Sequence, residues 1–171
     1  VVGWRCGARG APGGAAVAWM VGEGGTRGKP SVRGIISGAV AGLVAITPAS
    51  GFVTPSGALW IGLAAGLVCF VMVTWVKVKL KYDDSLDVFG IHGMGGIVGA
   101  VLTGVFAAPG IGGAAGLPYG NARPVWTQVP GLAPTGIWSG PRAFLILTVI
   151  HLTIGLRVSR DVAIELRPVN P

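Results

Sequence analysis

The sequence predicts an all-α fold, a polytopic transmembrane helix bundle. Of the 171 residues, 51% are hydrophobic and only 11% are charged, and the mean hydropathy is +0.71. A soluble domain usually carries about 25% charged residues, so this composition is that of a membrane protein. Three stretches without Asp, Glu, Lys or Arg also have the roughly 20 residues that a helix needs to cross a bilayer.

The net charge of +7 favours the same fold class because of where the basic residues stand. No charged residue occurs from 34 to 76, and the cations gather beside the apolar runs, as Arg27, Lys29, Arg33, Lys77, Lys79, Lys81, Arg157, Arg160 and Arg167. Basic residues in alternate loops are the positive-inside pattern of a multi-span protein. They do not form the continuous basic face that phosphates require, so we expect no nucleic acid partner.

The N-terminal residues 1–14 are rich in glycine and show no helical period. We assign them no regular structure and treat them as a divergent N-terminal stretch. Residues 15–20 are apolar but too few to span the bilayer, and we interpret them as the end of a helix.

Two predicted spans follow, at residues 34–53 and 57–76, separated by the turn formers Thr54, Pro55 and Ser56. Pro48 lies inside the first of them, and we interpret it as a tolerated kink; a helix break that forms part of a binding site is the alternative. The third span, residues 88–108, follows three residues that cap helices, Asp84, Ser85 and Asp87. We take Asp87 as a helix cap with a structural role; a binding carboxylate is the alternative.

Glycine recurs every four residues in each predicted span, at Gly34, Gly38 and Gly42, at Gly62 and Gly66, and at Gly95 and Gly99. In lipid, small residues at this interval let helix backbones approach closely. We therefore expect the helices to pack through these glycines.

Beyond the third span, the helical pattern ends. Six prolines interrupt residues 109–142, which we predict to be an irregular Pro/Gly-rich segment. Residues 143–171 supply a short apolar segment and a tail. The apolar part, residues 143–156, is short for a span, and His151 within it is interpreted as a surface or interfacial histidine.

One histidine, His92, lies in the run DSLDVFGIHGMGG near the start of the third span. An ionisable side chain within a membrane helix usually faces a pore or a partner, so His92 indicates a membrane conduit. A hydrogen bond to a neighbouring helix is the alternative.

Cys6 and Cys69 have no disulfide or metal spacing, and a lone histidine makes neither a metal site nor a catalytic pair. We therefore expect no enzyme activity and no cofactor.

Four segments follow one another as they do in ammonium transporters: AWMVGEGGTRGKPS, GAVAGLVAITPASGFV, GALWIGLAAGLVCF and YDDSLDVFGIHGMGGIVGAVLTGVFA. The chain resembles this family over about residues 15–108, the membrane domain. LTIGLRV, residues 152–158, resembles the place where the family's last helix meets its cytoplasmic tail.

The resemblance implies a bundle of two inverted five-helix repeats and a final helix, in which this chain is part of the second inverted repeat. It implies a multi-pass protein of the cell membrane, a homotrimer, with a PII-type regulatory protein as a partner on the cytoplasmic face. The implied function is transport of ammonium or ammonia through an apolar pore lined by two histidines. His92 resembles the second of that pair, Val88 a residue that narrows the pore, Val40 a wall residue, and Thr47 a hydroxyl near the outer part of the channel.

The chain has no counterpart of the first pore histidine. The alternative to a transporter is therefore an inactive structural membrane fragment of one.

The charge pattern predicts that residues 22–33 and 77–84 lie in the cytoplasm and residues 54–56 outside it. A cysteine that replaces Ser56 should react with an impermeant thiol reagent added outside intact cells, and one that replaces Lys79 should not. The reverse pattern of labelling would show that the orientation is wrong.

Overall fold

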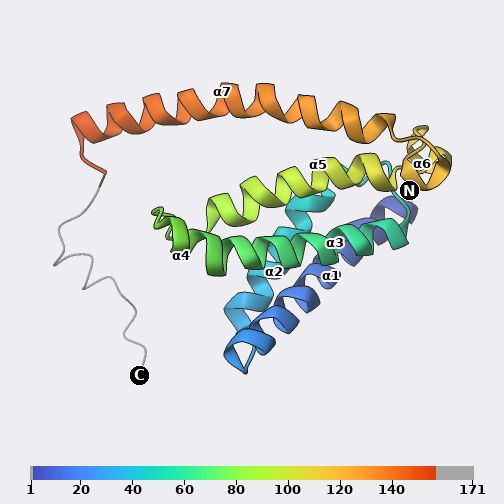
Figure 1. Ribbon diagram of the computed structural model, residues 1–171, viewed down its shortest axis with the longest axis horizontal. Helices are drawn as coiled ribbons and strands as arrows, with labels where there is room; N and C mark the ends of the chain where they lie inside the picture. Colours follow the sequence, from blue (N-terminus) through green and yellow to red (C-terminus); the bar gives the residue numbers. More distant parts are fainter. Residues whose placement is uncertain (1, 157–171) are drawn as a thin grey trace. The chain divides into compact units, whose positions relative to one another are not determined.

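The computed structural model describes the backbone of residues 2–156 and the side chains of residues 9–156. The chain divides into two compact units, residues 1–130 and residues 131–171. Within the described residues the sole β feature is an isolated bridge between Val53 and Ala107, so the all-α prediction is confirmed. The helices, drawn in Figure 1, are α1 (Val2–Arg27), α2 (Val32–Ile46), α3 (Pro55–Val71), the π-helix η1 (Met72–Val76), α4 (Lys77–Leu80), the π-helix η2 (Phe89–Gly93), α5 (Met94–Phe106), α6 (Pro109–Gly112), the 3-10 helix η3 (Leu117–Tyr119) and α7 (Arg123–Thr153).

Two of the three predicted spans are long apolar helices. The elements α3, η1 and α4 run on as one helix of 26 residues, Pro55–Leu80, and η2 runs on into α5 as one of 18 residues, Phe89–Phe106. Both are long and apolar enough to cross a membrane. The first of them begins where Thr54 accepts a hydrogen bond from the Gly57 amide and Pro55 occupies the first turn, where its missing N–H costs nothing.

The first predicted span is shorter than expected, because α2 has 15 residues and ends at Ile46 rather than at residue 53. Pro48 has no N–H, so the regular ladder of hydrogen bonds cannot continue through it. The backbone turns instead through i→i−3 bonds, from the Thr47 amide to Val44 and from the Ala49 amide to Ile46. Pro48 therefore ends the helix, and the expected kink is wrong.

The N-terminal stretch is helical rather than irregular. Helix α1 covers residues 2–27, with Pro12 inside it, and Ala11 is completely buried. The expectation for residues 1–14 is therefore wrong. The physical reason is that abundant glycine and alanine form a contact surface for neighbouring helices in a membrane protein, whereas the same composition in water favours disorder.

Residues 123–142 are also helical, as the first two thirds of α7. The expectation of an irregular segment over residues 109–142 is wrong for this part, and residues 143–153 are the end of a 31-residue helix rather than a short separate segment. Pro124 lies in the first turn, where proline is favoured. At about 100° per residue, Pro130, Pro134 and Pro141 fall within about 40° of one another, so the donors that they lack are confined to one side of the helix.

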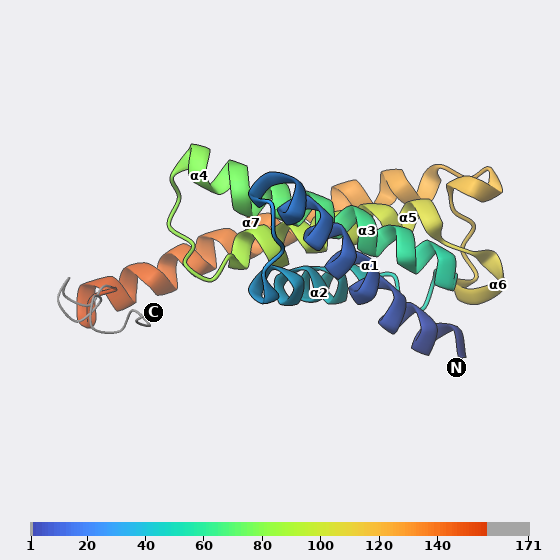
Figure 2. The same ribbon diagram turned by 90° about the horizontal axis from the view of Figure 1, so that it is seen from below.

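The glycine stripes form the helix contacts, as the spacing predicts. Helix α1 packs against both α2 and α3 (Figure 2). A Cβ atom added to Gly42 of α2 would lie 2.5 Å from the Ala11 carbonyl oxygen of α1, and one added to Gly66 of α3 would lie 2.5 Å from that of Ala15. Gly62 meets the Ala11 carbonyl from the other side, so α1 is enclosed by backbone on two sides.

A buried carboxylate joins α1 to α2. Glu23, 3% exposed, accepts a hydrogen bond from the Ser31 amide at 2.8 Å and bonds to the Ser31 hydroxyl at 3.0 Å. Arg27 Nη1 lies 3.1 Å from its Oε1, and the Ser31 hydroxyl in turn caps α2 by accepting from the Gly34 amide. The bond from the Ser31 amide is the main cause that lowers the pKa of Glu23 below its usual value, so the folded state favours the charged carboxylate.

A pair of glycine substitutions tests the contact between α1 and α3. Gly62→Ala places a methyl group against the Ala11 carbonyl, which is rigid backbone, whereas Gly96→Ala in α5 places one where no atom lies within 4 Å. We expect Gly62→Ala to lower the free energy of unfolding by about 1–3 kcal/mol and Gly96→Ala to leave it unchanged or raise it by up to about 1 kcal/mol. Thermal unfolding in detergent measures both, and equal midpoints for the two variants would contradict the contact.

Glu23→Gln tests the junction between α1 and α2 through its pH dependence. Because the folded-state pKa of Glu23 lies below its unfolded value, the charged carboxylate stabilises the fold above that unfolded value, about pH 4.3. This stabilisation is lost as the pH falls through the folded pKa. The wild type should therefore unfold at a higher temperature than Glu23→Gln at pH 7, and the gap should close as the pH is lowered below about 4.3. A gap that stays constant down to about pH 3 would assign the stabilisation to packing alone.

Candidate functional site

His92 lies in the π-helix η2, close to the beginning of the second long apolar helix. Its side chain is exposed, whereas its neighbour Ile91 is buried in a cluster with Trp19 and Phe70. His92 has no hydrogen-bond or ion-pair partner among the residues that the structure describes. The imidazole is therefore free to bond to something outside this chain.

Of the other predicted site residues, Val88 lies one turn from His92, Val40 packs against the cluster that contains its neighbour Ile91, and Thr47 lies elsewhere. Val88 precedes His92 by one turn and is 50% exposed. Val40 of α2 is half-buried and packs against the cluster that contains Ile91. Thr47 lies at the far end of α2, exposed, and its hydroxyl donates to the Leu43 carbonyl at 2.8 Å.

The cap of η2 is Asp84 rather than Asp87. The Asp84 carboxylate accepts from the Val88 and Phe89 amides, both at 2.8 Å. Asp87 has a left-handed backbone with φ of 57° and forms an ion pair with Lys77, whose Nζ lies 2.6 Å from its Oδ1. Its predicted capping role is therefore wrong, because the turn at φ 57° directs its carboxylate to a lysine of the preceding helix.

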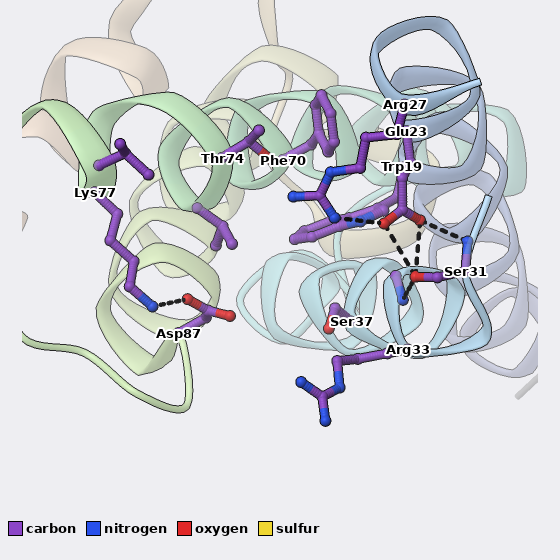
Figure 3. A pocket seen from close by; sticks show the side chains of 13 residues that line it. Trp19, Glu23, Arg27, Ser31, Arg33, Ser37, Phe70, Thr74, Lys77 and Asp87 are labelled. Carbon is purple, nitrogen blue, oxygen red and sulfur yellow. Dashed lines mark hydrogen bonds and ion pairs between the residues drawn. The ribbon is translucent and has the colours of Figure 1, made fainter. Parts of the chain in front are cut away.

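A cavity of about 310 Å³ with charged residues in its lining lies at one end of the bundle. At this end α1 carries Glu23 and Arg27, and Lys77 follows η1. Figure 3 shows the Arg27–Glu23–Ser31 network on one side of it and the Lys77–Asp87 pair on the other. Its lining also includes Trp19, Arg33, Ser37, Phe70 and Thr74. Trp19 lies edge to face against Phe70, with ring centroids 5.7 Å apart.

The charges of the cavity are compensated in pairs. Glu23 is neutralised by Arg27 and Asp87 by Lys77, which leaves Arg33 without an ion-pair partner among the described residues. Sequence reasoning missed Glu23, although a signal was present, because it is the sole acidic residue before Asp83.

The arrangement is a polar, charged opening followed by an apolar wall that carries one imidazole. Asp87 lines the opening, and Val88 and His92 follow it along the same helix. A neutral imidazole can donate one hydrogen bond and accept another. Within the described residues, no three His, Cys, Asp or Glu side chains gather as metal ligands do. The arrangement therefore offers one imidazole that can both donate and accept a hydrogen bond beside an otherwise apolar surface.

The family model and the related sequences that match this chain all belong to ammonium transporters. The model of the Ammonium Transporter Family matches residues 10–166, so the match is longer than the resemblance over residues 15–108 and includes residues 109–142. An ammonium transporter of Aquifex aeolicus is 54% identical over 152 residues, which cover 89% of this chain and 36% of that protein. One from Bacillus subtilis is 43% identical over 147 residues, 85% of this chain and 35% of that protein.

Comparison with solved structures agrees. The crystal structure of Mep2 from Saccharomyces cerevisiae matches with a TM-score of 0.83 and 32% identity, over 94% of this chain and 38% of that chain. The present chain spans little more than a third of the length of these relatives. Because the family match runs through nearly the whole sequence and the helices superimpose on a solved relative, this chain belongs to the ammonium transporter family, whose members are integral membrane transporters.

Proposed function

We propose that this chain forms one wall of a channel that conducts ammonium across the membrane as ammonia, with His92 as the hydrogen-bonding group of the wall. The observation that carries the proposal is the exposed, unpartnered imidazole of His92 on the same side of a membrane helix as Val88. Related proteins named as ammonium transporters support the choice of substrate.

The proposed mechanism follows from the polarity along this wall. An ammonium ion loses favourable hydration on passing from the charged cavity to the apolar residues Val88 and Val40, so the neutral molecule enters at lower cost. Ammonia still needs a hydrogen-bond partner in a path that excludes water. His92 supplies a donor and an acceptor there and carries no net charge of its own when neutral.

Further features of the whole protein are part of the same proposal. We place it in the cell membrane as a homotrimer, with the cavity around Glu23 and Lys77 on the cytoplasmic side, where a PII-type regulatory protein would bind. The positive-inside distribution of the loops supports this orientation. Thr47 at the other end of α2 would then lie near the outer part of the channel.

A chimera tests the function, because the chain spans only about a third of its relatives. Residues 10–156 replace the matching segment of the Aquifex aeolicus transporter, and uptake of labelled methylammonium is measured in cells that lack other transporters. We expect the chimera to transport, His92→Leu to reduce uptake sharply, and His92→Glu to admit potassium as well, because a carboxylate binds cations. The present chain alone should give no uptake above background, since Val88 and His92 then lack an opposite wall.

The matched control is His151→Leu, because His151 is the chain's other histidine and lies exposed in α7. It should leave uptake unchanged. A His92→Leu chimera that assembles normally and transports ammonium with unchanged rate and selectivity would overturn the proposed role. Uptake by the chain alone would overturn the requirement for a second wall.

A further inference from the structure

We infer that Gly90 is a positioning residue: it allows the π-helix η2 to lie against η1, and this π-helix turns Val88 and His92 away from the face through which α5 packs. The burial of individual residues distinguishes a packed face of this helix from an open one. Gly90, Gly95 and Gly99 are buried, whereas Val88 and His92 are exposed. The inference rests on the proposed function only in taking the exposed face as the channel wall.

A regular α-helix would give the opposite arrangement. At about 100° per residue, Val88 and His92 would both lie within about 20° of Gly99, and Gly90 would lie about 180° from it. Gly99 packs against α2, where a Cβ atom added to it would meet the Ala45 carbonyl oxygen. In α-helical register, therefore, Val88 and His92 would face α2 and Gly90 would be exposed.

The π-helix accounts for the difference. The Met94 amide is shared between the Ile91 and Phe89 carbonyls, and its bond to Phe89 spans five residues rather than four. Each π turn contains an extra residue, so the residues before it are rotated relative to the helix that follows. The rotation brings Gly90 inward and carries Val88 and His92 outward together, which explains why the two stay on one side.

The contact between η2 and η1 leaves no space for a side chain at Gly90. A Cβ atom added to it would lie 2.7 Å from Val73 Cγ2, in the facing π-helix η1. A valine side chain cannot easily turn away, because its branched Cβ restricts χ1. Any larger residue at position 90 must push η2 away from η1 or rotate it.

The start of η2 is fixed independently of Gly90. Asp84 caps the Val88 and Phe89 amides, and Lys77 bonds both to the Asp87 carboxylate and to the Asp84 carbonyl. Lys77 directly follows η1, so the two π-helices are tied together at one end by this pair. The rotation of His92 is thus held between an ion pair at one end and a glycine contact in the middle.

Thiol labelling of the full chain in detergent measures the direction of residue 92 without any transport assay. The parent carries His92→Cys and Cys6→Ser, and it keeps Cys69, whose buried thiol reports on folding. N-ethylmaleimide should rapidly modify the thiol introduced at position 92 of the parent. Deletion of Gly90 restores α-helical register and should slow this modification about tenfold or more, because thiol reaction depends on access. Gly90→Ala should slow it less, and the control Gly96→Ala, whose added methyl meets no atom within 4 Å, should not slow it.

Each result decides the inference. Unchanged labelling at position 92 in the deletion and in Gly90→Ala, with Cys69 protected, would overturn it. If the deletion exposes Cys69, the chain has unfolded, and Gly90→Ala alone is then decisive: slower labelling supports the inference and equal labelling overturns it. Failure of the proposed function is separate, since a chimera indifferent to His92→Leu would leave these labelling rates as they are.

Discussion

The fold depends on the contact between the backbone of α1 and the glycines of its two neighbours. At Ala11 and Ala15, carbonyl oxygens of α1 meet Gly42 of α2 on one side and Gly62 and Gly66 of α3 on the other. Apolar burial gives little drive for helix association within lipid, so close van der Waals contact must supply it. Because the glycines have no side chains, the three helices come near enough for that contact.

This close contact determines where polar groups are found. Where Ala11 and Ala15 of α1 meet the glycines there is space for little more than backbone, and the ion-paired residues Glu23, Arg27, Lys77 and Asp87 lie nearer the helix ends. Each of the two acids forms an ion pair with a base, so no carboxylate of the pair of acids faces the apolar core without a partner. The polar cavity and the apolar wall are therefore two results of one packing scheme.

The candidate site depends on an irregularity within this regular packing. Two π-helices face each other at Val73 and Gly90, and the one that carries His92 moves it from the packed face of its helix to the open one. Such π segments are frequent at functional positions. A polar residue that would be costly in a glycine contact thus becomes available to a ligand, and the helix keeps its packing through Gly95 and Gly99.

The sequence by itself determined the all-α membrane fold, two of the three spans, the glycine contacts and His92 as an unusual group, because composition, hydropathy and residue spacing are local properties. Only the tertiary structure decided the helical N-terminus around Ala11, the helicity of residues 123–142, and Asp84 rather than Asp87 as the cap. These features depend on partners distant in sequence or on where missing donors fall around a helix. The direction of His92 belongs to the same class, because a π-helix is stabilised by the facing helix, and a residue's own neighbours in the sequence predict the ordinary α-helical register.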